Sequence, residues 1–274
     1  ADSAESSTTS TSASSSDSKF SSTTTQEQGV DLGGRSIIKK NYLFIANNNY
    51  YPYSIATSVP EGSAAKATAS LSPVLETTSI VRVLQRTSSG EINPLSEVSL
   101  ALDSNNIDGL YLNNDILTVI STAQQNYSLY SSQLVFDPST YVEPSFTISF
   151  VDVSAPANSE VTNSYQFDGS IVNSRRVGDV LYIVSRYQPY IEGLSYATTD
   201  EQKIANYALI NNTDVADLLP KYHGNDGVEQ SLVGEQQCLL AENATDKDGF
   251  DTIMTLTAIN INNPQQLNSV CINT

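Results

Sequence analysis

The stretch Ser174-Arg-Arg-Val-Gly-Asp-Val-Leu-Tyr-Ile-Val-Ser185 decides the fold of this chain. It consists of two short segments separated by Gly-Asp, and the second segment is rich in β-branched and aromatic residues, which favour strands. A Gly-Asp pair suits the primed turns of tight hairpins, since both residue types tolerate positive φ. The stretch therefore predicts a β-hairpin.

Two other stretches repeat this pattern, over residues 35–46 and 109–120. Their turns carry Lys-Asn and Asn-Asp, and all three second strands share a leucine, at Leu43, Leu117 and Leu181. The shared leucines lie roughly 65 to 75 residues apart, whereas a propeller blade of the WD40 type has about 40 to 45 residues. We therefore expect each repeat to carry a long insertion.

Further strands lie between the hairpins. Residues 79–84, 146–153 and 255–261 have strand patterns at similar positions in each repeat, and residues 163–167 continue the second of them. The unit is a four-stranded antiparallel meander, which is typical of a β-propeller. We predict an all-β fold, a partial β-propeller of about four blades with long inserted loops, over residues 26–274.

Several of these stretches resemble motifs of one protein family. Residues 174–184 are similar to its SRRIGDYLYLV hairpin, and residues 148–156 resemble its VDVSDP strand and turn. Residues 25–31, with the hairpin at 41–45, resemble its opening blade, and residues 217–220 and 248–250 are also similar. The family is that of secreted prokaryotic β-propeller proteins distantly related to WD40 repeats.

The chain departs from that family in two ways. Leu32-Gly33-Gly34 stands where the family usually has acidic residues, and family members normally continue well past this length. The resemblance implies that the chain is the N-terminal part of a longer propeller. A partial propeller exposes an open edge and an apolar flank, so we expect the rest of the propeller or a partner chain to cover them.

The first 25 residues have a different composition. Ser and Thr account for 17 of them, and such a segment buries too little apolar surface to offset its chain entropy. We predict a disordered tail over residues 1–25 that tethers the domain or acts as a plain linker.

Charge and cysteine content restrict partners and compartment. The formal net charge of −17 makes binding to nucleic acid or to an anionic membrane surface unfavourable, and no apolar run is long enough to span a membrane. Exactly two cysteines, Cys238 and Cys271, suit a disulfide in an oxidising compartment, although two separate buried thiols are an alternative. We expect a secreted, periplasmic or cell-surface protein.

Catalytic and metal motifs are sparse. His223, the single histidine, lies in a Gly-rich stretch that we interpret as a surface loop, and no Gly-x-Ser-x-Gly elbow accompanies it. The sequence therefore leans against an enzyme and predicts no cofactor except Ca²⁺. Asp246, Asp248 and Asp251 flank a glycine turn and could bind Ca²⁺, or they could form a charged turn only.

Tyrosines gather in the segments that follow the three hairpins. Equivalent segments of successive blades project from one face, and Tyr with Ser and Asn is the chemistry of adaptable recognition surfaces. The alternative is that these tyrosines pack the insertions onto the blades. The eight residues are Tyr50, Tyr51, Tyr53, Tyr127, Tyr130, Tyr187, Tyr190 and Tyr196.

These features favour an extracellular or envelope-associated binding or scaffold module, with a protein or the rest of the propeller as partner. Two alternatives remain open. One is a carbohydrate- or surface-binding, adhesin-like module with a glycan as partner. The other is a hydrolase or lyase of the propeller type, which predicts converging carboxylates with a perturbed pKa in the central channel.

Overall fold

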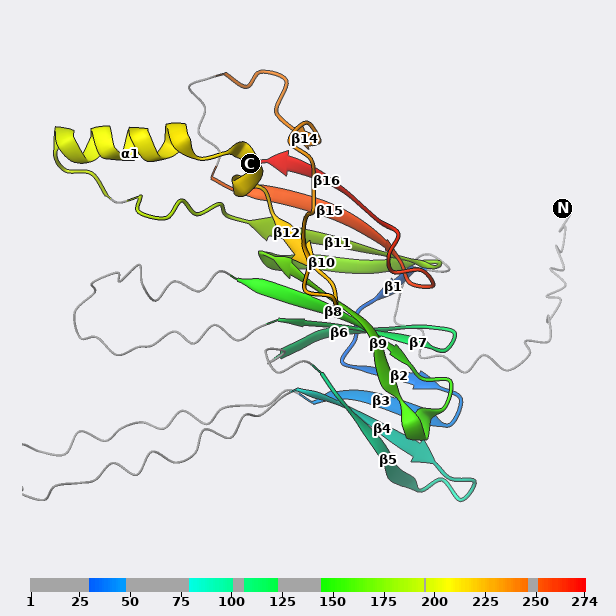
Figure 1. Ribbon diagram of the computed structural model, residues 1–274. Helices are drawn as coiled ribbons and strands as arrows, with labels where there is room; N and C mark the ends of the chain where they lie inside the picture. Colours follow the sequence, from blue (N-terminus) through cyan, green and yellow to red (C-terminus); the bar gives the residue numbers. More distant parts are fainter. Residues whose placement is uncertain (1–29, 48–78, 101–105, 123–143, 195, 246–250) are drawn as a thin grey trace, which may run out of the picture.

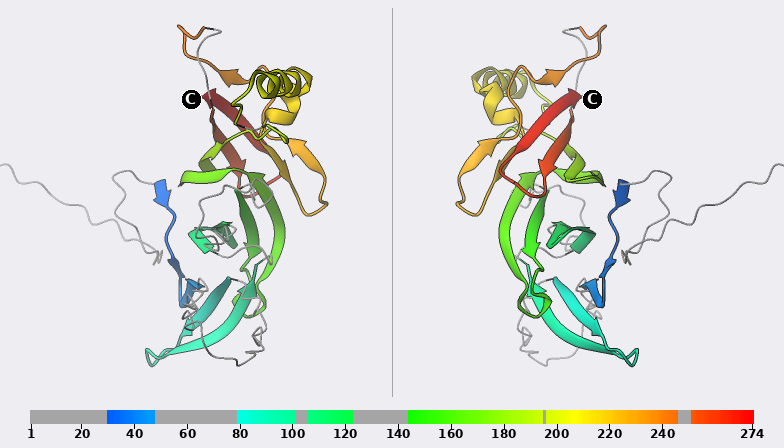
Figure 2. Two further views of the ribbon diagram at one scale, coloured as in Figure 1. Left: turned by 90° about the vertical axis from the view of Figure 1, so that its left-hand side faces the viewer. Right: turned by 90° about the vertical axis from the view of Figure 1, so that its right-hand side faces the viewer.

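A computed structural model describes residues 30–47, 79–100, 106–122, 144–194, 196–245 and 251–274. The predicted tail over residues 1–25 lies outside this range. The described strands form three sheets, which Figure 2 shows one above another, with the sheet of residues 36–99 at the bottom. We call the sheets blades 1, 2 and 3 in chain order.

Each blade is built on an antiparallel meander of four strands that opens with one of the predicted hairpins (Figure 1). Blade 1 consists of β2 (Ser36–Lys39), β3 (Tyr42–Asn47), β4 (Ile80–Arg86) and β5 (Ile92–Ser99). Blade 2 contains β6 (Asn106–Asn113), β7 (Ile116–Thr122), β8 (Ser145–Asp152) and β9 (Glu160–Asp168). Blade 3 contains β10 (Ser170–Val177), β11 (Val180–Tyr187), β15 (Ile253–Asn260) and β16 (Leu267–Asn273).

Two blades gain further strands at their edges. Blade 2 is extended beyond β9 by β12 (Lys221–His223) and β13 (Glu229–Ser231). Blade 3 is flanked by β1 (Val30–Leu32) beside β10 and by β14 (Cys238–Leu239) beside β16. The all-β propeller prediction is confirmed, and the described residues form three blades where the sequence predicted about four.

The hairpin turns repeat residue by residue. The first turn residue has a positive φ in all three hairpins, 54° at Lys40, 53° at Asn114 and 58° at Gly178. Positive φ at this position is the hallmark of the primed turns whose twist matches that of the strands. The three turns therefore have the conformation that the Lys-Asn, Asn-Asp and Gly-Asp pairs predicted.

Two hydrophobic clusters join the blades. One lies between blades 1 and 2 and includes Phe44, Val81 and Leu117. The other lies between blades 2 and 3 and includes Ile148, Phe150 and Leu181. Because blade 2 has buried apolar residues in both clusters, each of its faces packs against a neighbouring blade.

A polar contact also repeats at each junction. Lys39 in β2 hydrogen-bonds to the Asp115 carboxylate in the turn of blade 2, and the Asn113 amide donates to Asp179 Oδ1 in the turn of blade 3 at 3.0 Å. Lys39 and Asn113 each precede the shared leucine by four residues, and Asp115 and Asp179 each precede it by two. The aspartates of the turns therefore link successive blades.

The N-terminal segment runs along the inner edges of all three blades (Figure 2). β1 pairs with β10 of blade 3, Gly34 bridges to Leu110 in β6 of blade 2, and β2 is itself the first strand of blade 1. A Cβ atom on Gly33 would lie 2.9 Å from the Tyr111 hydroxyl oxygen and 3.2 Å from Gly109 Cα. This close approach explains why glycine, and not an acidic residue, follows β1.

One helix of 13 residues stands apart from the blades. α1 (Asp200–Asn212) has no buried residue and extends away from the sheets in Figure 1. It begins with a capping box in which the Thr199 hydroxyl accepts from the Gln202 backbone N–H. Two short 3₁₀ helices, η2 (Pro156–Asn158) and η3 (Val215–Leu218), complete the described elements. No described helix has the length and hydropathy needed to cross a membrane.

Cys238 and Cys271 form a disulfide, as predicted, with a Cα–Cα distance of 4.4 Å. The bond joins β14 to β16, where the two cysteines are direct partners in a parallel pair. It therefore fastens the chain that leads from blade 2 to the outer edge of blade 3.

Loss of this disulfide is expected to lower stability. Replacing both cysteines by alanine should reduce the free energy of unfolding by about 3 kcal/mol or more, because the bond closes a 33-residue span. Urea unfolding of the double variant and of the wild type, each with and without reductant, measures the effect. Reductant should lower the unfolding midpoint of the wild type only. An equal lowering of the midpoint in both proteins would contradict the assignment of the disulfide.

Candidate functional site

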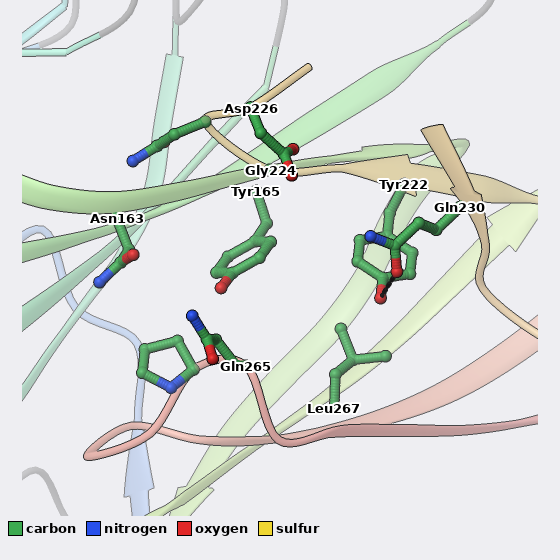
Figure 3. Close-up of a pocket in the computed structure, with 10 residues that line it drawn as sticks. Asn163, Tyr165, Tyr222, Gly224, Asp226, Gln230, Gln265 and Leu267 are labelled. Atoms are coloured by element: carbon green, nitrogen blue, oxygen red, sulfur yellow. Dashed lines mark hydrogen bonds between the residues drawn. The ribbon is translucent and has the colours of Figure 1, made fainter. Parts of the chain in front are cut away.

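The described part of the chain contains a pocket of about 380 Å³ between the outer part of blade 2 and the turn that joins β15 to β16 (Figure 3). Blade 2 supplies one wall from β9, β12 and β13, and blade 3 supplies the other from residues 264–267. The lining residues are Asn163, Tyr165, Tyr222, Gly224, Asn225, Asp226, Gln230, Pro264, Gln265 and Leu267.

Two tyrosines form the aromatic wall of the pocket. The rings of Tyr165 and Tyr222 lie 6.4 Å apart between centroids. The Tyr222 ring stacks on Phe167 at 5.6 Å, and the Tyr165 ring meets Phe150 edge-on at 6.3 Å. Because both phenylalanines belong to the core between blades 2 and 3, the tyrosines are held in place by core packing.

The turn that joins β12 to β13 brings a carboxylate and an amide to the pocket. Gly227 N–H donates to Gly224 C=O at 3.0 Å, and Val228 N–H donates to Asp226 Oδ1 at 3.1 Å. The Tyr222 hydroxyl donates to Gln230 Oε1 at 2.9 Å across β12 and β13. A Cβ atom on Gly224 would lie 3.3 Å from Tyr165 Cε1, so the turn packs closely on the tyrosine ring.

The lining of the pocket is polar and slightly acidic. Its ten lining residues include one carboxylate, four side-chain amides and no lysine, arginine or histidine. Partial burial raises the pKa of the Tyr165 hydroxyl, and Tyr222 and Asp226 raise it further. The phenol therefore stays protonated and can donate a hydrogen bond throughout the physiological pH range.

Asp168 holds β12 in position below the pocket. Its Oδ2 atom accepts a hydrogen bond from Lys221 N–H at 2.9 Å, at the start of β12. Burial raises the pKa of the Asp168 carboxyl above its ordinary value of 3.8, and Glu229 also raises it. The Lys221 N–H and the charges of Lys221 and His223 oppose this rise.

The raised pKa of Asp168 predicts a pH-dependent stability. The charged carboxylate is penalised in the folded state, so its contribution to stability is complete below 3.8 and is lost as pH rises through the folded pKa. Asp168→Asn keeps an oxygen acceptor for Lys221 N–H and removes the charge. Thermal melting should show a higher Tm for the variant at pH 7 and no difference below pH 3.8. Glu91→Gln, on the exposed turn before β5, is the control, and a lower Tm for Asp168→Asn at pH 7 would contradict the expectation.

The predicted tyrosine surface is only partly described. Tyr50, Tyr51, Tyr53, Tyr127 and Tyr130 lie outside the described residues. Tyr187, at the end of β11, is 7% exposed and packs in the core between blades 2 and 3, so it offers little surface for binding. Tyr190 and Tyr196 are exposed, at 38% and 92%. β3, β7 and β11 all end at the left of Figure 1. A shared tyrosine surface beyond these ends stays a prediction.

The predicted calcium turn also lies mostly outside the described residues. Asp246 and Asp248 are not described, and Asp251 is exposed and accepts a hydrogen bond from the Thr252 hydroxyl at 3.1 Å. Among the described residues no cluster of three or more metal-ligating side chains is present. Calcium binding by this turn stays a prediction.

The calcium prediction can be tested by melting the protein with Ca²⁺ and with EDTA. A bound ion stabilises the folded state by mass action, so Ca²⁺ should raise the Tm and Asp246→Asn with Asp248→Asn should abolish the rise. Glu242→Gln, an exposed acid nearby, is the control. Equal melting temperatures of the wild type in Ca²⁺ and in EDTA would contradict the prediction.

Two carboxyls with a raised pKa bear on the enzyme alternative. Burial raises the pKa of Asp108 in β6, where Thr122 and Arg35 are its neighbours, and the pKa of Asp168, where Lys221 and Glu229 are its neighbours. Neither carboxyl acts on the other. His223 lies in strand β12 and not in the loop that the sequence predicted, and it pairs with Gln166 and Glu229. The enzyme alternative stays a prediction.

The pocket was not predicted from the sequence. Its residues come from three segments, 163–165, 222–230 and 264–267, which only the packing of blade 3 on blade 2 brings together. Tyr165 and Tyr222 are ordinary strand tyrosines in the sequence. No spacing rule connects them with Pro264 and Gln265.

The three repeated meanders define the chain as a β-propeller protein. The family model described as a beta propeller domain matches residues 20–274, and the chain therefore belongs to that family. No curated protein and no solved structure matched the chain.

Proposed function

We propose that this chain is an extracellular or envelope-associated binding and scaffold module, and that the outer face of blade 3 binds a further β-sheet. The observation that carries the proposal is a set of exposed apolar residues on blade 3. They occupy the positions that are buried between blades elsewhere in the molecule.

Strand register defines these equivalent positions. In blade 1 the row Ala46–Val81–Val98 crosses β3, β4 and β5 and belongs to the core shared with blade 2. In blade 2 the equivalent row is Ile120–Ile148–Tyr165, which belongs to or packs against the core shared with blade 3. In blade 3 the equivalent row is Val184–Leu256–Val270.

In blade 3, Leu256 and Val270 of this row are exposed to solvent, and Val184 is half-buried. Leu256 is 45% exposed and Val270 is 48% exposed, whereas Val81 and Ile148 are fully buried. Tyr182 and Ile272 are also exposed on this face. A contiguous apolar patch on one face of a sheet is typical of an interaction surface.

The interfaces between the three blades indicate what kind of sheet can pack against the outer face of blade 3. The faces of blades 2 and 3 that pack against the preceding blade carry uncharged residues. In blade 2 these include Leu117, Val119 and Ser121 in β7, with Ser149 in β8. In blade 3 they include Leu181, Ile183 and Ser185 in β11, with Thr257 in β15. The matching face of blade 1 carries Leu43 and Ile45, but Arg82 stands at the position of Ser149 and pairs with Glu97 at 3.1 Å. An ion pair in an apolar interface is costly. The partner is therefore a sheet other than blade 1 of a second copy.

The proposed location rests on composition and on the disulfide. A disulfide between Cys238 and Cys271 persists in an oxidising compartment. The Ser/Thr-rich segment and the net charge of −17 suit an exported protein that is attached through its N-terminal part.

Photo-crosslinking in the source organism tests this proposal. A photoreactive amino acid at Val270 should crosslink to a β-strand of another sheet, and the product should appear in the envelope or medium fraction. The same group at Ile204, which is 69% exposed on α1, is the control for an exposed apolar position. No product at Val270, or the same product at both positions, would contradict the proposal.

A carbohydrate-binding role is the second candidate, because the pocket between blades 2 and 3 combines tyrosine rings with side-chain amides. Catalysis remains the least supported of the three alternatives.

A further inference from the structure

The pocket between blades 2 and 3 presents hydrogen-bonding groups that the described protein residues do not satisfy. Within the described part of the chain, the amides of Asn163 and Gln265 and the hydroxyl of Tyr165 have no protein hydrogen-bond partner. Figure 3 shows these three side chains around one side of the pocket, with the Tyr165 hydroxyl directed toward Gln265. Amides and hydroxyls both donate and accept, so together they suit a ligand whose groups do the same.

The pocket is also amphipathic. The rings of Tyr165 and Tyr222 form one wall, and Leu267 lies opposite them (Figure 3). Pro264 also lines the pocket. A sugar ring has hydroxyls around its edge and apolar C–H groups on its faces, so it can satisfy both kinds of surface. The volume of about 380 Å³ falls within the range of about 300 to 1,000 Å³ that is usual for small-molecule sites.

Charge discriminates between ligand classes. Asp226 is the one charged lining residue, which makes an anionic ligand unfavourable in a chain with a net charge of −17. A cation is favoured by a cage of several aromatic faces or by several carboxylates. Phe167 covers one face of the Tyr222 ring, which leaves too few open faces for a cage, and the single carboxylate, Asp226, already accepts a hydrogen bond from Val228 N–H at Oδ1. Of the three ligand classes, a neutral ligand therefore suits this pocket best.

We propose that this pocket binds a neutral saccharide. The Tyr165 and Tyr222 rings and Leu267 contact its C–H face, and the Asn163, Gln265 and Tyr165 polar groups bind its hydroxyls. The site lies where blade 2 meets blade 3 and is separate from the outer face of blade 3, so it does not depend on the proposed sheet binding. The saccharide proposal rests on the second candidate function, carbohydrate binding, and names the ligand class and the residues that would bind it.

Saturation-transfer NMR and calorimetry on the 274-residue chain test the proposal, with maltotriose, cellotriose, mannotriose and triacetylchitotriose as probes. Trigalacturonate and choline serve as the anionic and cationic comparisons. At least one neutral trisaccharide should bind, with a Kd on the order of 1 mM or below. Failure of all four, or tighter binding of trigalacturonate or choline, would overturn the proposal.

Variants assign the binding to the pocket. Asn163→Ala, Gln265→Ala and Tyr165→Phe should each weaken binding about 3- to 10-fold, because each removes one hydrogen-bonding group. Asn268→Ala is the matched control, since Asn268 occupies the position in β16 that Asn163 occupies in β9 and lies outside the pocket. Circular dichroism spectra that match the wild type ensure that folding is intact. Unchanged affinity in all three pocket variants would show that the sugar binds elsewhere.

Discussion

Replacement of Gly169 by alanine is expected to destabilise the protein by about 3–5 kcal/mol. Gly169 joins β9 of blade 2 to β10 of blade 3 and has a φ of 93°. A Cβ atom there would lie 2.4 Å from the backbone oxygen of Arg186 and 3.2 Å from Tyr187 Cα. Backbone atoms of β11 cannot move aside without disturbing the sheet, so the connection between two blades must shift.

Gly90 provides a matched control for this experiment. It has a φ of 92°, in the turn between β4 and β5, and an added Cβ atom would meet no atom within 4 Å. Gly90→Ala should therefore cost only the backbone strain, about 1–2 kcal/mol. Urea unfolding of both variants measures the difference, and equal midpoints would contradict the close packing of Gly169 against β11.

The second large effect is expected at Ile148. Its side chain is fully buried in β8 between blades 2 and 3, and truncation removes three carbon atoms from this core. Ile148→Ala should lower the free energy of unfolding by about 3–4 kcal/mol, through lost burial and the cavity that is left.

Leu256 is the natural control, since it occupies the same position of the repeat in β15. Register places Ile148 beside Ile120 and Leu256 beside Val184, and Ile120 and Val184 each follow the shared leucine by three residues. Leu256 is 45% exposed, so Leu256→Ala should cost about 1 kcal/mol or less. Chemical unfolding of Ile148→Ala and Leu256→Ala measures the two losses of unfolding free energy. A cost at Leu256 as large as that at Ile148 would mean that the outer face of blade 3 is already covered.

The repeated hairpins could be predicted from the sequence because their signals are local. Each turn pair tolerates positive φ, and Leu43, Leu117 and Leu181 occupy the same position in β3, β7 and β11. The third strands of the meanders followed from period-two patterns in short windows. The disulfide was predicted because two cysteines in one strand-rich segment leave a single pairing.

Other parts of the fold depend on long-range packing or on a weak signal. β1 pairs with β10 across more than 140 residues, and the close approach of Gly33 to Tyr111 explains the glycine that follows β1. α1 was missed because it buries no residue and so has no apolar stripe. The capping box of Thr199 and Gln202 was the signal in the sequence that could have revealed it.

For the candidate site too, local features could be predicted from the sequence, whereas features that depend on long-range packing could not. Tyrosine enrichment in the segments after the hairpins was visible in the sequence, yet Tyr187 packs in the core because its position in β11 continues the inward row of Leu181, Ile183 and Ser185. The pocket tyrosines, Tyr165 and Tyr222, became distinctive only when β12 paired with β9 and blade 3 closed over them.

The central claim, that the outer face of blade 3 is an open interface between blades, is tested most directly by the binding of the apolar dye ANS to the folded protein. The wild type should enhance ANS fluorescence, and Leu256→Lys with Val270→Lys should abolish most of the enhancement, since both residues lie at the centre of this face. Ile204→Lys with Tyr207→Lys, on exposed α1, should leave most of it. An enhancement that persists in the blade 3 variant, or its absence from the wild type, would contradict the claim.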